Sequence, residues 1–154
     1  MNNAYYFDLL GECDDMPLAE AKRCVEAECD SFSFVRSGPG YLIAEFPEEC
    51  LDAIADRISL THAIGRYLGR YDPGDLSDLE GAALPDGSFA IRGKRFRGLM
   101  ADADSQGIIR KAGAVFSKKH EVDLKEPDNI IDLVMNDDVH LFLRERSIEK
   151  DLLE

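Results

Sequence analysis

Residues 32–46 read FSFVRSGPGYLIAEF, and this stretch decides the architecture of the first half of the chain. Runs rich in aromatic and aliphatic residues stand on both sides of the segment SGPG at residues 37–40. That arrangement is typical of two strands joined by a turn. We therefore predict a β-hairpin whose strands occupy residues 32–36 and 41–46.

The segments around this hairpin extend it into a larger unit. Upstream, residues 5–10 (YYFDLL) read as a strand, and residues 14–17 open a helix whose apolar residues recur at helical spacing. Downstream, residues 47–49 begin a second helix with a proline suited to a first turn, and residues 61–71 form a last strand. The order is βαββαβ, which is a ferredoxin-like split unit, and the fold class is α+β.

A second unit follows a boundary rich in proline and glycine at residues 72–87. Residues 88–96 (SFAIRGKRF) read as a strand with a basic end, and Asp104 or Ser105 can cap the helix that follows. The charged tail from residue 145 onward is prone to form a helix. Three further strands are expected between that helix and the tail, at residues 121–124, 130–135 and 139–144.

Length and composition suit two small domains. The chain has 154 residues, of which 45% are hydrophobic and 32% charged, as in soluble globular proteins. No apolar run approaches the roughly 18 to 20 residues of a membrane span, and the N-terminus lacks the basic start and apolar stretch of a signal peptide. We expect a cytoplasmic protein without a membrane partner, with domains at residues 1–72 and 73–146 and a linker or tail beginning at 147–154.

Patterns that indicate catalysis or metal binding are missing from the sequence. The four cysteines form no C-x-x-C pair and nothing indicates secretion, so we expect reduced thiols and no metal site. The three histidines, His62, His120 and His140, lie in unrelated places and read as surface or partly buried polar residues. No phosphate-binding loop or dinucleotide fingerprint occurs. We therefore expect no catalytic residue and no cofactor in this chain, which reads as a binding module.

The distribution of charge points to a partner. The net charge is −13, yet residues 88–120 carry eight basic side chains against only Asp102 and Asp104. We call these eight residues the basic island: Arg92, Lys94, Arg95, Arg97, Arg110, Lys111, Lys118 and Lys119. A face that is merely solvated is the competing interpretation, and cations at the end of a helix, such as Lys118 and Lys119, also favour the helix dipole.

The second half resembles a THUMP domain. The resemblance is carried by residues 89–95 (FAIRGKR), 107–113 (GIIRKAG), 122–128 (VDLKEPD) and 130–134 (IIDLV), of which VDLKEPD is the most specific. The βαββαβ unit resembles the ferredoxin-like domain that precedes THUMP in RNA-modifying enzymes. Together they are most similar to the front half of archaeal tRNA guanine-N2 methyltransferases; 4-thiouridine synthetases and some cytidine deaminases share the module.

This resemblance implies binding of tRNA at the acceptor stem and the single-stranded 3′ end. The basic island would hold phosphates, and Phe96 could stack on a base. Arg36 and Tyr41, which flank the SGPG turn, are weaker candidates. The sequence lacks the glycine-rich loop for S-adenosylmethionine and the motif of amino methylation. We therefore expect S-adenosylmethionine and catalysis in a methyltransferase domain further along the same protein.

Two other functions compete with this interpretation. A protein-interaction or adaptor module for a separate catalytic subunit would suit the acidic first half. A small metabolite enzyme or sensor is not supported, because the sequence shows no set of polar residues that would converge on a small ligand. Salt dependence and charge reversal at Arg95 and Arg110 separate RNA binding from a partner that docks on the acidic half.

Overall fold

The predicted hairpin is present and forms one edge of the first sheet. The computed structural model describes residues 2–10, 15–97 and 99–148. Strands β2 (Ser33–Gly38) and β3 (Tyr41–Pro47) pair antiparallel, with Gly38 opposite Tyr41. Gly40 has a φ of +76°, a backbone conformation that glycine adopts at little cost, so this residue lets the chain reverse.

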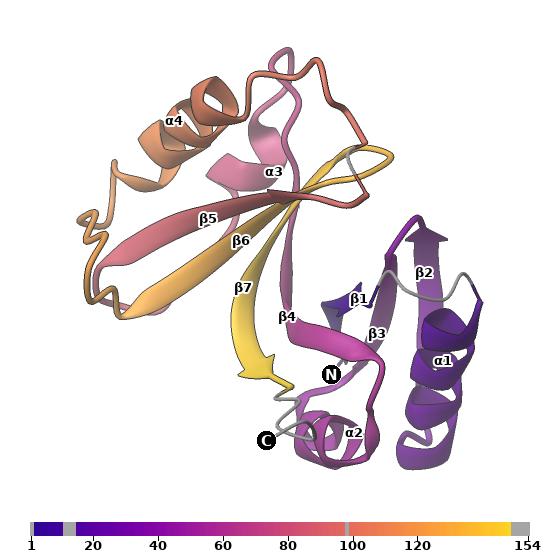
Figure 1. Cartoon of the computed structure of the whole chain (residues 1–154). Coiled ribbons are helices and arrows are strands. Elements are labelled where there is room, and N and C mark those ends of the chain that lie inside the picture. The colour runs from indigo at the N-terminus through magenta and orange to yellow at the C-terminus, as the bar shows by residue number, and fades with distance from the viewer. Residues whose placement is uncertain (1, 11–14, 98, 149–154) are drawn as a thin grey trace. The chain divides into compact units, whose positions relative to one another are not determined.

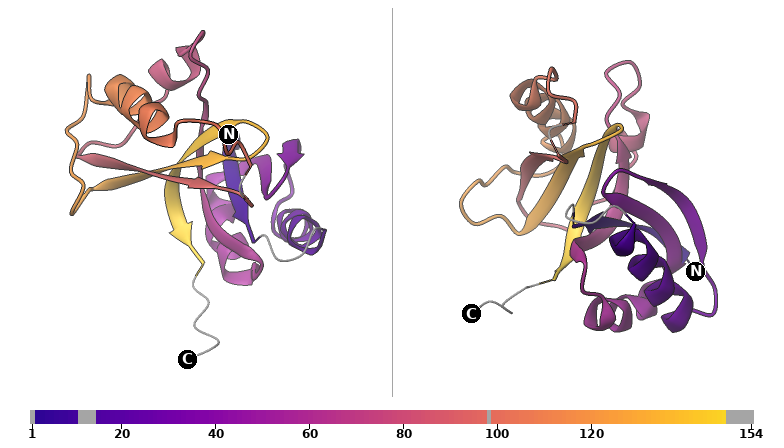
Figure 2. Two further views of the ribbon diagram at one scale, coloured as in Figure 1. Left: turned by 45° about the horizontal axis from the view of Figure 1, so that its top comes forward. Right: turned by 45° about the vertical axis from the view of Figure 1, so that its right-hand side comes forward.

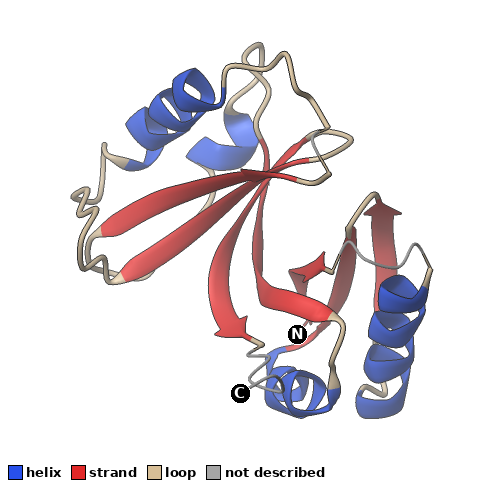
Figure 3. Ribbon diagram, viewed as in Figure 1, coloured by secondary structure: helices blue, strands red, loops and turns tan. Residues whose placement is uncertain are grey.

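Two more strands complete the sheet of the first unit. Strand β1 (Asn2–Leu9) lies between β3 and β4 (Thr61–Arg70) and is antiparallel to both. The helical segments are α1 (Met16–Glu28), the short 3₁₀ turn η1 (Glu48–Cys50) and α2 (Leu51–Arg57). Figures 1 and 3 show the resulting βαββαβ order, which confirms the ferredoxin-like unit and the α+β class.

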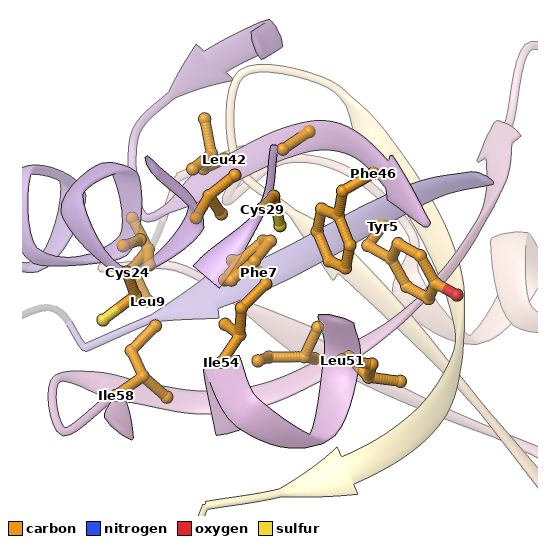
Figure 4. Close-up of a cluster of buried hydrophobic side chains, with 14 residues drawn as sticks. Tyr5, Phe7, Leu9, Cys24, Cys29, Leu42, Phe46, Leu51, Ile54 and Ile58 are labelled. Carbon is orange, nitrogen blue, oxygen red and sulfur yellow. The ribbon is translucent and has the colours of Figure 1, made fainter. Parts of the chain in front are cut away.

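The core of this unit lies between the sheet and its two helices. Alternate residues of β1, Tyr5, Phe7 and Leu9, are buried in one cluster with side chains of α1 and α2 (Figure 4). The rings of Tyr5 and Phe46 stack with their centroids 4.5 Å apart. Because the alternation of β1 places these side chains on one face of the sheet, α1 and α2 must both cover that face.

The second unit is a smaller sheet with helices α3 (Ser77–Glu80) and α4 (Ser105–Phe116). Its strands are the end of β4 together with β7 (Val139–Ser147), β6 (Asn129–Met135) and β5 (Phe89–Arg95), paired in that order. Strand β5 runs parallel to β6, and β6 is antiparallel to β7. Parallel neighbours need a crossover connection, and α4 provides it (Figure 2). One face of α4, with Ala112, Val115 and Phe116, packs into the core of this sheet.

The chain divides into residues 1–67 with 145–154, and residues 68–144. These limits differ from the expected 1–72 and 73–146 because the end of β7 returns to the first unit. There the N–H of Ile148 donates to the carbonyl of His62 at 2.9 Å, and Arg146 pairs with Asp52 at 2.7 Å.

Three sequence expectations are wrong in detail. Residues 145–147 continue β7 instead of forming a helix, and Ile148 is not helical either; residues 149–154 lie outside the described residues. Residues 121–124 form no strand, only a single parallel bridge between Val122 and Phe89. His140 is wholly buried because it lies opposite buried Val134 in the β6–β7 pairing, and its Nε2 is 3.1 Å from a carboxylate oxygen of Asp137. Among the described residues, no helix is long and apolar enough to cross a membrane.

Candidate nucleic-acid interface

Strand β5 presents Arg92 and Lys94 on one face of the sheet and Gly93 on the other. Gly93 faces α4, since a Cβ added there would lie 2.8 Å from Cδ1 of Ile109. Side chains alternate along a strand, so Arg92 and Lys94 project from the face away from α4. Both are exposed. The strand therefore presents cations on one face and a glycine gap on the other.

The face that carries Arg92 also holds an ion pair between neighbouring strands. Arg144 donates from Nε to Oδ2 of Asp132 at 2.8 Å and from Nη2 to Oδ1 at 2.6 Å. Asp132 is also the register partner of Arg92 on β5. The carboxylate of Asp132 is thus bound to Arg144 on one side while Arg92 stands exposed on the other, next to Lys94.

Arg95 serves the structure of the loop that follows β5. Its guanidinium donates from Nε to the carbonyl of Met100 at 3.2 Å and from Nη2 to the carbonyl of Ala103. These bonds fix the path of the chain toward Asp104, whose carboxylate accepts the N–H of Gly107 and caps α4 as predicted. Part of the charge of Arg95 is therefore directed into the fold and away from any ligand.

Phe96 and Arg97 form a stacked pair at the end of the strand. The guanidinium carbon of Arg97 lies 5.3 Å from the centroid of the Phe96 ring. The Phe96 ring is half-buried, and its backbone N–H donates to the carbonyl of Met135. One side of the aromatic ring is consequently covered by a cation, and a base that stacks there must displace it or stack on the guanidinium itself.

A groove of about 620 Å³ runs between α4, β5 and the segment 122–124. It is lined by apolar side chains and two glycines together with a few polar groups: Phe89, Ile91, Gly93, Gln106, Ile109, Arg110, Gly113, Ala114, Ser117, Val122 and Leu124. Arg110 is the basic-island residue that lines it, and Lys111 is exposed on the same helix. The groove thus combines an apolar lining with a cation.

The wall of the groove opposite α4 comes from the VDLKEPD segment and is held rigidly. The side chain of Asp123 accepts the backbone N–H groups of Lys125 and Glu126, and the N–H of Asp123 donates to the carbonyl of Phe89. Asp128 accepts the N–H of Ser88 at 3.0 Å. Because these bonds fix the backbone on both sides of Leu124, its side chain is displayed at 73% exposure.

The outer edge of β5 opens beside this groove. Phe89 uses its outward N–H and C=O groups to bond Glu121 and Asp123. In a parallel strand the same groups of every second residue point to that side, here those of Ile91 and Gly93. Over the described part of the chain, no strand pairs with this edge beyond Phe89. A flat, partly apolar ligand could therefore meet backbone donors and acceptors as well as Arg110.

Lys118 and Lys119 lie elsewhere, just after α4. They line a separate hollow of about 470 Å³ with Leu79, Leu84 and other apolar residues. Nζ of Lys118 is 3.8 Å from Glu80. The structure therefore does not gather the basic island into one patch but spreads it over the groove, this hollow and the other face of β5.

The weaker candidates from the first unit differ from each other. Tyr41 is completely buried and stacks against Tyr6 with ring centroids 5.3 Å apart, so it has no free face for a base. Arg36 is exposed on β2. Over the described residues no group of three potential metal ligands occurs; Cys24, Cys29 and Cys50 are free thiols, and Cys13 lies outside those residues.

Sequence reasoning missed Gly93 and Leu124. An isolated glycine within a strand signals a close approach of another group, and this signal could have identified the floor of the groove. No comparable signal marks Leu124, because its exposure follows from hydrogen bonds of Asp123 that appear only in three dimensions.

The sequence comparison gives one relative and no family model that matches the chain. Over 143 residues the chain is 27% identical to a tRNA (guanine(10)-N2)-dimethyltransferase from Methanothermobacter thermautotrophicus. The match covers 89% of this chain and 42% of that protein. The chain therefore spans about two fifths of the length of the curated relative.

Solved structures show the same fold. PH1313 from Pyrococcus horikoshii Ot3 matches 95% of this chain and 55% of its own, with a TM-score of 0.63 at 15% identity. The match to a 4-thiouridine synthetase, solved as an RNA complex with bound ATP, covers 96% of this chain and 42% of that chain, with a TM-score of 0.60 at 14% sequence identity. The match to TrmN from Thermus thermophilus covers 97% of this chain and 48% of that chain, with a TM-score of 0.57 at 20% sequence identity. The predicted resemblance to the THUMP-containing RNA methylases is thereby confirmed, and the chain has the fold of the THUMP proteins.

Proposed function

We propose that this chain is the RNA-binding module of a tRNA-modifying enzyme and that it grips the acceptor stem and the unpaired 3′ end of tRNA. The name of the curated relative and the RNA bound by a structural neighbour support the class of partner. The observation that carries the proposal is the groove between α4 and β5, because it offers an apolar lining, an open strand edge and Arg110 in one place.

The chemistry of the groove suits unpaired nucleotides. Single-stranded RNA is held by stacking or packing on the faces of its bases and by cations at its phosphates. Leu124 and Ile109 would pack against a base, and Arg110 would bind the neighbouring phosphate. Lys111 would extend this contact along the helix surface.

The remaining cations suit the phosphates of a duplex. Arg92 and Lys94 stand on the other face of the same strand, and Lys118 and Lys119 lie beyond the end of α4. Phosphate contacts set affinity and orientation without reading sequence. A stem that spans these positions would be held in register while its single-stranded end enters the groove.

We assign methyl transfer to a guanine of tRNA, with S-adenosylmethionine, to a C-terminal domain of the same protein. The support is that the relative is more than twice as long as the matched segment. In this arrangement the present chain binds and orients tRNA and carries no reacting group. An adaptor that assists a separate catalytic subunit would use the same groove. The two functions therefore differ only in whether the catalytic domain belongs to the same protein or to a separate subunit.

Binding of labelled deacylated tRNA, measured by fluorescence anisotropy at low and physiological salt, tests the proposal. Arg110→Glu and Lys111→Glu should weaken binding, and each lost phosphate contact should lower the salt slope by about one unit. Arg23→Glu reverses a charge on the exposed surface of α1 and serves as the matched control. Equal losses in all three variants would show a general charge effect and contradict the proposal.

Leu124→Ala tests the groove directly. The side chain is 73% exposed, so its removal should leave stability nearly unchanged. We expect it to weaken intact tRNA severalfold but to have no effect on tRNA that lacks its 3′ single-stranded end. If the variant binds both RNAs as the original chain does, the 3′ end does not use this groove.

A further inference from the structure

One residue that lines the groove between α4 and β5 is a glycine in the interior of a helix. Positions 106, 109, 110 and 113 of α4 and its C-cap residue 117 all line the groove, because residues three or four apart share one face of a helix. Gly113 stands in the middle of that face, about one turn from Arg110 on one side and from Ser117 on the other. The face therefore carries side chains towards both ends and bare backbone between them.

The fold does not require a glycine at position 113. Alanine is preferred in the interior of a helix, because glycine loses more conformational freedom on folding. Gly113 has the helical backbone of α4, which any residue can adopt. Among the described residues, a Cβ added there would have one neighbour within 4 Å apart from the adjacent residues and the helix backbone. That neighbour is Cδ1 of Ile91 at 3.8 Å, which is an ordinary van der Waals contact.

Two other glycines of the second unit differ from Gly113 in this respect. A Cβ at Gly93 would lie 2.8 Å from Cδ1 of Ile109, and a Cβ at Gly107 would overlap the carboxylate of Asp104, which caps α4. Those glycines allow close contacts within the protein. Glycine also allows a ligand to approach the backbone closely, and the space above Gly113 belongs to the groove.

We propose that Gly113 is the position at which the groove binds one unpaired base, with the flat face of the base against the helix backbone. This inference rests on the proposed function, because it takes the occupant of the groove to be the unpaired 3′ end of tRNA. Base faces bind by stacking or packing on flat surfaces. Arg110, on the same face of α4, would bind the phosphate of that nucleotide, and Leu124 would cover the base from the opposite wall.

A side chain at position 113 would occupy the space of the base. Alanine should therefore stabilise the helix and at the same time weaken binding, and a larger side chain should weaken binding further. A purely structural role predicts a different result, since replacing a glycine that the fold needs lowers the melting temperature. Stability and affinity that change in opposite directions thus separate the two roles.

The test compares the original chain with Gly113→Ala and Gly113→Leu in melting temperature and in binding of labelled deacylated tRNA with and without its 3′ single-stranded end. For Gly113→Ala we expect a melting temperature that is higher by roughly 2–4 °C. Its binding of tRNA with the 3′ end should be severalfold weaker, and its binding of tRNA without that end should be unchanged. Gly113→Leu should bind the two RNAs alike. Ala19→Gly, on the exposed surface of α1, is the matched control, which should lower the melting temperature and change neither affinity.

The possible failures are distinguishable. If Gly113→Ala binds both RNAs as the original chain does while Leu124→Ala still weakens tRNA with its 3′ end, this inference is wrong and the proposed function stands. A lower melting temperature of Gly113→Ala would also overturn the inference, because the fold would then require the glycine. If the original chain itself binds the two RNAs equally, the proposed function fails and the inference fails with it.

Discussion

Replacement of Asp132 by asparagine should destabilise the second unit more than the loss of an exposed charge would. The carboxylate is only 11% exposed and makes two short bonds to Arg144, which keeps 31% of its side-chain surface in water. Breaking a fully buried ion pair costs roughly 3–5 kcal/mol. Because Arg144 can still be partly hydrated, we expect Asp132→Asn to lower the free energy of unfolding by about 2–3 kcal/mol.

Urea unfolding followed by circular dichroism measures this change, and a double-mutant cycle isolates the pair. Arg144→Met removes the partner while it keeps an unbranched side chain of similar length. The coupling between the two substitutions should exceed about 1 kcal/mol, since each single variant already removes the ion pair between Asp132 and Arg144. A coupling near zero would refute the reasoning, because the two short bonds would then contribute no more than hydration does.

The same variant separates stability from binding. Asp132 is the register partner of Arg92, so its neutralisation removes a negative charge beside an exposed cation. At a temperature where the variant is still folded, tRNA affinity at low salt should stay equal or increase. A loss of affinity in the folded variant would mean that Asp132 positions Arg92 for its ligand.

Two further predictions concern charged groups near strand ends. Arg95→Met removes the donors that bind the carbonyls of Met100 and Ala103. Limited proteolysis should therefore cut residues 96–104 at least severalfold faster, while the far-ultraviolet circular dichroism spectrum stays unchanged. Equal cleavage rates would show that the loop does not depend on Arg95. Burial, the largest cause, raises the pKa of Glu145 above its ordinary value, although Arg66 opposes it. The folded protein therefore binds a proton at Glu145 more tightly than the unfolded chain does. The stability that this proton provides is fully present below the pKa of the unfolded state and is lost as the pH rises through the pKa of the folded state. Glu145→Gln should therefore raise the melting temperature at neutral pH but not below about pH 4, and a gain that is the same at both pH values would contradict this assignment.

Much of the fold follows from the sequence because short-range patterns determine it. The SGPG turn, the proline that precedes η1 and the Asp104 cap each act within a few residues, and the structure contains all three elements where they were predicted. The end of β7 was not predictable in this way. Residues 145–147 are charged like an exposed helix, yet Arg146 finds its partner in Asp52, far away along the chain.

The candidate site shows the same limit. Strand alternation assigns Arg92 and Lys94 to one face, and a sequence reader could have separated them from Gly93. The sequence does not reveal that Arg95 binds carbonyls of its own loop or that Tyr41 is buried against Tyr6. Both contacts depend on which segments pack together in the folded chain. Counting cations therefore overstated how many of them lie together on one surface.

Under the proposed function, the groove binds RNA although the VDLKEPD segment that forms its wall is itself acidic. Asp123 and Asp128 use their carboxylates to accept backbone N–H groups, so these negative charges fix the loop. An ordered loop loses little conformational freedom when a ligand binds, and the rigid display of Leu124 thus favours affinity. Under the proposed function the acidic residues of the segment assist RNA binding indirectly, and Asp123→Ala should weaken binding only where the 3′ end is present. A uniform loss with and without the 3′ end would instead indicate that the negative charge of Asp123, and not the order that it imposes, controls the interface.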